Sequence, residues 1–157
     1  MLMDGFKRSA VSIIIQFEDE FLLLKRTKFP YVGRYLPVGG KIEAFESPED
    51  AARREALEET GINIHQLKYR GLLVETSPHP RYNWTCFIFT SELEEKIEAP
   101  ECDEGQLEWV KIKDLPHLDI PATDLPIYNC IADNDVFVFS ATFDADLHML
   151  EMHRLDQ

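Results

Sequence analysis

The segment that most constrains this chain carries the start and stop signals of an α-helix in its own residues. Ser47 is a favourable N-cap, and Pro48 suits the first helical position, where its missing N–H would be unpaired in any case. Gly61 suits the left-handed position that commonly ends a helix. The sequence therefore predicts a helix over Ser47–Thr60, against which the rest of the chain must pack.

This helix carries an unfavourable group of acids. Glu55, Glu58 and Glu59 share one face at a spacing of i, i+3 and i+4, where like charges cost roughly 0.2–0.5 kcal/mol per pair. They also lie in the last turns, where the helix dipole disfavours acids. A solvated acidic face is the simplest explanation. However, Ala51 and Ala52 lie at nearly the same angles around the helix as the three acids. Small residues there indicate that this face is packed closely against another element, with its acids in a cleft. Three carboxylates in such a cleft could hold Mg²⁺.

The residues before the helix are rich in Gly and Pro, and we expect Thr27–Gly40 to be a loop. Its end, Val38-Gly39-Gly40-Lys41, would bring bare backbone close to a metal ion or a phosphate group.

Apolar runs predict the other elements, with hairpins at the first and last strand pairs. The expected strands and second helix are Val11–Phe17, Glu20–Arg26, Leu67–Thr76, Trp84–Ser91, Gln106–Ile112, the helix Leu125–Ala132, Val136–Phe143 and Leu147–Arg154. Because strands and helices do not alternate regularly, this order predicts an α+β fold with a mixed sheet.

Length and composition limit the functional classes. The chain has 157 residues, 45% of them hydrophobic, so we expect one domain over 1–157. A formal net charge of -13 argues against a nucleic-acid polymer as partner, because phosphate backbones require a basic surface. Apolar runs are too short to span a membrane, and Met1–Ser9 has no signal-like stretch. Three cysteines without a CxxC pair are typical of reduced thiols, so we expect a cytoplasmic protein.

The segment Gly40–Ile62 carries a specific pattern. Its residues fit G-x5-E-x7-R-E-U-x-E-E-x-G-U, where U is a bulky aliphatic residue, with Glu46 and Arg54 at their fixed places. The departure is Ala56 at the first U position. On this pattern the chain resembles the Nudix hydrolase family.

A wider likeness runs from about Ser9 to Arg154. Asp103–Val110 and the closing hairpin resemble the bacterial MutT-like branch, which includes 8-oxo-dGTP diphosphatases. The resemblance implies an α/β/α sandwich around a mixed β-sheet. It also implies an enzyme that hydrolyses pyrophosphate bonds with Mg²⁺, for which Mn²⁺ could substitute.

The resemblance also assigns roles to individual residues. It implies metal ligands at Glu55, Glu58 and Glu59, at the backbone carbonyl of Gly39, and at Glu104 in a downstream loop. Glu101 and Asp103 are neighbouring alternatives to Glu104.

The same resemblance identifies residues that support the site. Glu46 and Arg54 would orient the catalytic helix, with Arg54 also steadying a carboxylate during catalysis, while Gly40 and Gly61 shape the backbone. The candidates for the general base are Glu58, Glu59 and Glu104, and the sequence does not choose among them.

We expect a nucleotide substrate, first a purine nucleoside triphosphate, oxidised or not, cleaved to a monophosphate and pyrophosphate. Candidate substrate-binding residues are Lys25, Arg26 and Lys41 for the phosphates, Tyr35 for stacking on the base, and Asp124 for the purine edge. Phe29 or Trp84 could stack instead, because no Trp accompanies Asp124.

Two alternatives stay open. One is hydrolysis of ADP-ribose or another nucleoside diphosphate sugar, supported only by Pro78 in a loop. The other is a ligand-binding module that has lost catalysis, which an intact pattern disfavours. The sequence does not decide whether the chain forms a homodimer.

Overall fold

A computed structural model describes residues 5–29 and 31–157, so the first four residues of Met1–Ser9 lie outside the described part. One mixed sheet of nine strands runs through it in the order β6-β7-β2-β3-β1-β5-β4-β8-β9. The strands are β1 (Arg8–Phe17), β2 (Glu20–Arg26), β3 (Tyr35–Lys41), β4 (Lys68–Thr76), β5 (Trp84–Glu92), β6 (Glu101–Cys102), β7 (Gly105–Lys111), β8 (Phe137–Phe143) and β9 (Met149–Arg154).

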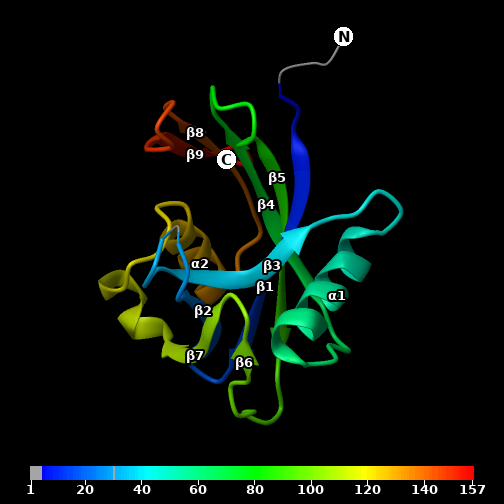
Figure 1. Ribbon diagram of the computed structural model, residues 1–157. Helices are drawn as coiled ribbons and strands as arrows, with labels where there is room; N and C mark the ends of the chain where they lie inside the picture. The colour runs from blue at the N-terminus through cyan, green and yellow to red at the C-terminus, as the bar shows by residue number, and fades with distance from the viewer. Residues whose placement is uncertain (1–4, 30) are drawn as a thin grey trace.

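Two α-helices pack against opposite sides of this sheet, α1 (Pro48–Thr60) and α2 (Asp124–Ala132), with a 3₁₀ helix, η1 (Ile112–His117), before the second (Figure 1). The predicted α+β class with a mixed sheet is confirmed, as is the three-layer arrangement. Within the described residues, neither helix has the length and apolar character needed to cross a membrane.

The central strand β1 shows how the two layers are built. Side chains alternate between the faces of a strand, so Ile13 and Ile15 pack with the buried alanines of α1. Ile14, between them, points to the other face and packs with Ile127 and Tyr128 of α2. All three isoleucines are at most 1% exposed, so β1 is the centre of both cores.

The predicted loop Thr27–Gly40 is wrong in its second half, because β3 occupies Tyr35–Lys41. β1 and β2 form the expected hairpin only near its turn, and β3 then lies between them in antiparallel pairing with both. This strand was not predicted because Pro37, Gly39 and Gly40 are residue types that are typical of loops. Gly39 is nonetheless required by it, since a Cβ there would collide with the carbonyl oxygen of Val11.

The other predicted elements are confirmed within three residues at each end, the largest difference being β1, which begins at Arg8 and not at Val11. The short elements β6 and η1 were not predicted. The helix signals also act as expected. The Ser47 side chain accepts a hydrogen bond from the Asp50 N–H, and Gly61 ends α1 in the left-handed conformation with φ 73°. The last turns of α1, which carry the acids, are therefore fixed by local sequence.

Candidate active site

The acids of α1 face the turn between β6 and β7. The space between these two elements, here called the acidic hollow, is lined by Glu55, Glu58, Glu59, Glu101, Cys102, Asp103 and Glu104. Two segments separated by some forty residues of sequence thus bring their carboxylates together.

Glu59 is the most strongly perturbed of these acids. Burial raises its pKa to about 8, with Glu55 and Glu104 adding to the rise. The Gly39 N–H opposes the shift by donating a 3.1 Å hydrogen bond to Glu59 Oε2. A carboxylate that is costly to charge at neutral pH, among other carboxylates, is stabilised when a cation binds beside it.

Glu55 lies directly against β3. A Cβ on Gly40 would collide with the Glu55 carboxylate, so this glycine gives the acid room. The Glu55 side chain is only 14% exposed, and burial raises its pKa, while Arg54 acts in the opposite direction. Gly39 and Gly40 therefore allow close packing within β3, and they do not lie in the loop that was expected.

Arg54 connects the acids to the chain before the helix. Its guanidinium donates hydrogen bonds to Glu46 Oε2 at 3.0 Å, Glu55 Oε1 at 2.9 Å and Glu58 Oε2 at 3.3 Å. A further bond of 3.0 Å reaches the Lys41 carbonyl. The Arg54 hydrogen bonds also lower the pKa of Glu46 to about 2. One planar cation thus holds two ligand candidates and anchors them through Glu46.

The β6–β7 turn offers three acids, and the structure distinguishes them. Glu104 is the one that borders both the acidic hollow and the neighbouring cleft described below, whereas Glu101 and Asp103 border the hollow alone. Its charge also raises the pKa of both Glu55 and Glu59. Among the three, Glu104 is therefore the best-placed partner for the helix acids.

These donors fit a hard divalent cation. All are oxygens, from carboxylates on α1 and the β6–β7 turn, with the Gly39 backbone in hydrogen-bond contact with Glu59. Mg²⁺ and Mn²⁺ prefer such ligands, and the buried charge of Glu59 lacks a cationic partner among the described residues.

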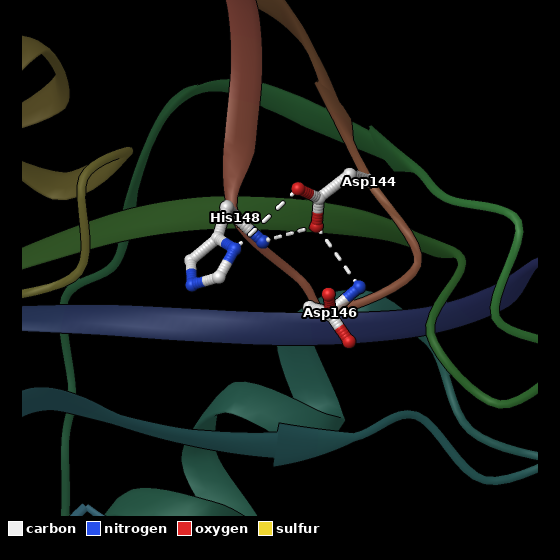
Figure 2. A group of neighbouring side chains, drawn as sticks. All are labelled: Asp144, Asp146 and His148. Atoms are coloured by element: carbon white, nitrogen blue, oxygen red, sulfur yellow. Dashed lines mark hydrogen bonds and ion pairs between the residues drawn. The ribbon is translucent and has the colours of Figure 1, made fainter.

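A second group of metal-binding residue types lies in the β8–β9 turn, where Asp144, Asp146 and His148 come together (Figure 2). Asp144 Oδ1 accepts hydrogen bonds of 2.9 Å from the backbone N–H groups of both Asp146 and His148. These bonds account for the arrangement as the closure of an exposed turn, so we assign no ion to it.

An apolar cleft of about 580 Å³ opens beside the acidic hollow, within the size range of small-molecule sites. Glu59 and Glu104 border both spaces. We call it the aromatic cleft, because its lining includes Tyr31, Tyr82 and Trp84, together with Leu24, Leu36 and Pro37.

The predicted substrate-binding residues differ in whether they border the aromatic cleft. Arg26 and Lys41 border the aromatic cleft. Lys25 and Tyr35 do not, because Tyr35 donates a 2.6 Å hydrogen bond to Glu108 and Lys25 lies over the Tyr35 ring. Strand alternation separates Lys25 from Arg26. Of the alternative stacking residues, Trp84 borders the cleft and Phe29 is 91% exposed.

Asp124 is placed beneath the surface, at the start of α2, and is 8% exposed. Its carboxylate accepts a 3.2 Å hydrogen bond from Thr123 and a 3.5 Å one from Tyr128. Burial raises its pKa to about 7. Asp124 itself borders neither the aromatic cleft nor the hollow next to it, which its neighbour Thr123 does border. Direct contact of Asp124 with a base would therefore require this region to open.

Replacing Asp124 by Asn is expected to flatten the pH dependence of stability. The folded-state pKa lies above the unfolded value, so the native state gains stability below the unfolded pKa and loses it as pH rises from about 3.8 through about 7. One such group changes the unfolding free energy by at most about 1.4 kcal/mol per pH unit. Urea denaturation at roughly pH 5 and pH 8 measures this, with the exposed Asp114→Asn as control. Parallel profiles for wild type and Asp124→Asn would contradict the buried, proton-binding state.

A family model described as the NUDIX domain matches residues 6–129, which include every residue of the acidic hollow and of the aromatic cleft. The chain belongs to the Nudix family. The helix acids, Arg54 and Gly40 are thus the family's sequence pattern seen in three dimensions. The family is an enzyme class that acts on pyrophosphate bonds and generally needs divalent metal ions.

Individual relatives extend this likeness beyond the pattern. The uncharacterized Nudix hydrolase YvcI of Bacillus subtilis is 29% identical over 122 residues, covering 76% of this chain and 75% of YvcI. Human diphosphoinositol polyphosphate phosphohydrolase 3-alpha is 31% identical, covering 71% of this chain and 68% of that protein. The crystal structure of the mutator MutT protein from Bacillus halodurans has a TM-score of 0.83 at 25% identity, covering 96% of this chain and 99% of that one. The MutT-like resemblance is therefore confirmed in the fold.

Sequence reasoning missed Tyr31 of this Nudix cleft and also a pair of hydrogen-bonded residues in it. Glu75 of β4 and Tyr82, before β5, both border the cleft, and the Tyr82 hydroxyl donates a 3.0 Å hydrogen bond to Glu75 Oε2. Burial raises the pKa of both groups, so the Tyr82 hydroxyl stays protonated and can donate to Glu75. The available signal was strand alternation, because Glu75 has the same parity as Gly71 and Leu73, an inward-facing set where an acid is unusual.

Proposed function

We propose that this enzyme hydrolyses purine nucleoside triphosphates, ordinary or oxidised, to the monophosphate and pyrophosphate. The observation that carries the proposal is the direct junction of the aromatic cleft with the acidic hollow through Glu59 and Glu104. A nucleotide matches these two adjoining spaces. Its base has flat, apolar faces that suit the aromatic cleft, and its phosphates need cations such as those that the acidic hollow would bind.

The lining of the cleft supports a base at one end. Tyr31, Tyr82 and Trp84 offer aromatic faces, which bind nucleobases by stacking. Glu75 can accept hydrogen bonds from amino or imino groups on a purine edge. Lys41 and Arg26 lie in the same cleft and can meet phosphate oxygens.

The same lining argues against a diphosphoinositol polyphosphate, the substrate named for the human relative. That class of molecule has no apolar ring face and carries many phosphates. The cleft has a largely apolar wall, two basic side chains and the acids Glu59, Glu75 and Glu104. ADP-ribose stays the second candidate, because its adenine would suit the same aromatic wall.

The chemistry follows from the placement of the acids. A divalent ion held by Glu55, Glu58 and Glu59 supplies, when bound, charge neutralisation at the phosphate and a more acidic water. Glu59 and Glu104 border the space where substrate would lie, so we propose that one of them takes the proton of the attacking water. Glu58 does not border the aromatic cleft, and its side chain is 60% exposed. Arg54 keeps Glu55 and Glu58 oriented during the reaction.

A substrate panel tests the proposal. The values of kcat/KM for 8-oxo-dGTP, dGTP, dATP, ADP-ribose and a diphosphoinositol polyphosphate are compared in one Mg²⁺ buffer. We expect a purine triphosphate to lead, with pyrophosphate as product, and activity to vanish in EDTA and return with Mg²⁺ or Mn²⁺, because the acidic hollow binds phosphates only through a cation.

Each part of this panel can fail separately. ADP-ribose preferred by tenfold or more would overturn the substrate while leaving the Nudix assignment intact. Activity that is unaffected by EDTA on every cleaved substrate would contradict the metal role of the helix acids. An absence of turnover on all substrates would favour a ligand-binding module.

A further inference from the structure

A second, basic pocket lies away from the aromatic cleft and the acidic hollow and shares no lining residue with either among the described residues. Its volume is about 630 Å³. It is bordered by segments from β1, α1, the chain before β4, the start of β4, the end of β5 and the end of α2. The residues that matter for its chemistry are Arg53, His65, Lys68, Arg70, Thr90 and Glu92.

The charge of this pocket is opposite to that of the protein as a whole. Arg53, Lys68 and Arg70 contribute three cations, with His65 beside them, and the single carboxylate among the lining residues belongs to Glu92. The whole chain has a formal net charge of -13. Three cations gathered around one hollow of such a protein favour an anionic ligand there.

Arg70 is the most unusual member of the group, because it is 5% exposed and has no carboxylate within ion-pair distance among the described residues. Its guanidinium donates only long hydrogen bonds to neutral acceptors, at 3.5 Å to Thr90 Oγ1, 3.2 Å to the Ile131 carbonyl and 3.4 Å to the Asp135 carbonyl. The Asp135 carboxylate acts on Arg70 without pairing with it, because it forms its ion pair with Arg154 at 2.8 Å. Its Nε has no acceptor at all. A buried cation without a directly paired counter-ion is costly, and a bound anion would reduce that cost.

A purely structural role explains part of this arrangement. The Ile131 carbonyl belongs to the last turn of α2 and already accepts a 3.0 Å hydrogen bond from the Asn134 N–H, so Arg70 adds a cation at the negative end of the helix dipole. This role does not require Arg53 or Lys68. Arg53 forms no hydrogen bond or ion pair within the described chain, and it lies on the side of α1 away from Glu55 and Glu58.

We propose that the basic pocket binds a small phosphate-bearing anion, at a site separate from the catalytic one. Guanidinium and ammonium groups recognise phosphate oxygens, and the hydroxyl groups of Thr90 and Ser91 and the amide of Gln66 add neutral donors along the wall. A tetrahedral phosphate with several acceptor oxygens can use more of these donors than a carboxylate can. The volume allows a ligand larger than a single phosphate.

Pyrophosphate in buffer containing EDTA is the probe for this site, because without a cation the carboxylates of the acidic hollow repel it. We expect saturable binding by calorimetry, and amide chemical-shift changes at Thr90 and Ser91 and not at Gly39 and Gly40. The double variant Arg53→Gln/Lys68→Gln should raise the Kd by roughly tenfold or more, since two charge-assisted contacts are lost.

Two controls make the test specific. Glu92→Gln removes the carboxylate of the pocket and should lower the Kd, whereas Lys111→Gln/Lys113→Gln removes two exposed cations elsewhere and should leave the Kd unchanged. A Kd that is equal in wild type and the Arg53/Lys68 variant overturns the site. Shift changes confined to Gly39 and Gly40 overturn it as well, by assigning the binding to the catalytic cleft.

Discussion

Replacing Glu59 by Gln is expected to lower kcat by roughly 10²–10⁴-fold while the protein stays folded. Glu59 is the acid that borders both spaces of the site and receives the Gly39 hydrogen bond, so it serves either as a metal ligand or as the base. Glutamine keeps the size and the hydrogen-bond acceptor but neither the charge nor the basicity. Initial-rate kinetics with saturating Mg²⁺ and a purine triphosphate measure the loss.

The thermal stability of the Glu59→Gln variant, unlike its activity, should not fall. Burial makes the charged form of Glu59 unfavourable, so a neutral side chain should leave the metal-free melting temperature unchanged or slightly raise it. Glu49→Gln, in the first turn of the same helix and exposed, is the matched control and should retain activity. If Glu59→Gln unfolded the protein without a separable catalytic loss, the role of this acid would be structural.

Replacing Arg54 by Lys should lower kcat/KM by roughly 10–100-fold, the usual effect of losing a group that orients metal ligands. Arg54 reaches Glu46, Glu55, Glu58 and the Lys41 carbonyl from one planar group. A lysine ammonium is a point charge with three donors and cannot span these acceptors together. Glu55 and Glu58 would then lose their fixed orientation although the net charge is unchanged.

The metal dependence separates this effect from a general loss of stability. We expect the Arg54→Lys variant to need a higher Mg²⁺ concentration for half-maximal activity, with its circular dichroism unchanged at the assay temperature. Arg81→Lys, an exposed arginine in the β4–β5 loop outside the described pockets, is the conservative control. An unaltered Mg²⁺ requirement together with full activity would show that the network around Arg54 is not needed to orient the acids.

The sequence by itself determined the parts of the site that depend on local geometry. Helical periodicity places Glu55, Glu58 and Glu59 on one face whatever surrounds them. The capping signals of Ser47 and Gly61 fix where that helix begins and ends. The alternating and continuous apolar runs were likewise sufficient for most strands, because side-chain direction in a strand has a period of two.

Tertiary structure alone decided which side chains meet across the sheet. The packing around β2 and β3 leaves Arg26 in the lining of the cleft and engages Tyr35 with Glu108 instead, although both were candidates in the sequence. The position of the β6–β7 turn selected Glu104 among its neighbours. These outcomes depend on strand pairing and packing between residues far apart in the chain, and no local pattern records how deeply a given side chain will be buried.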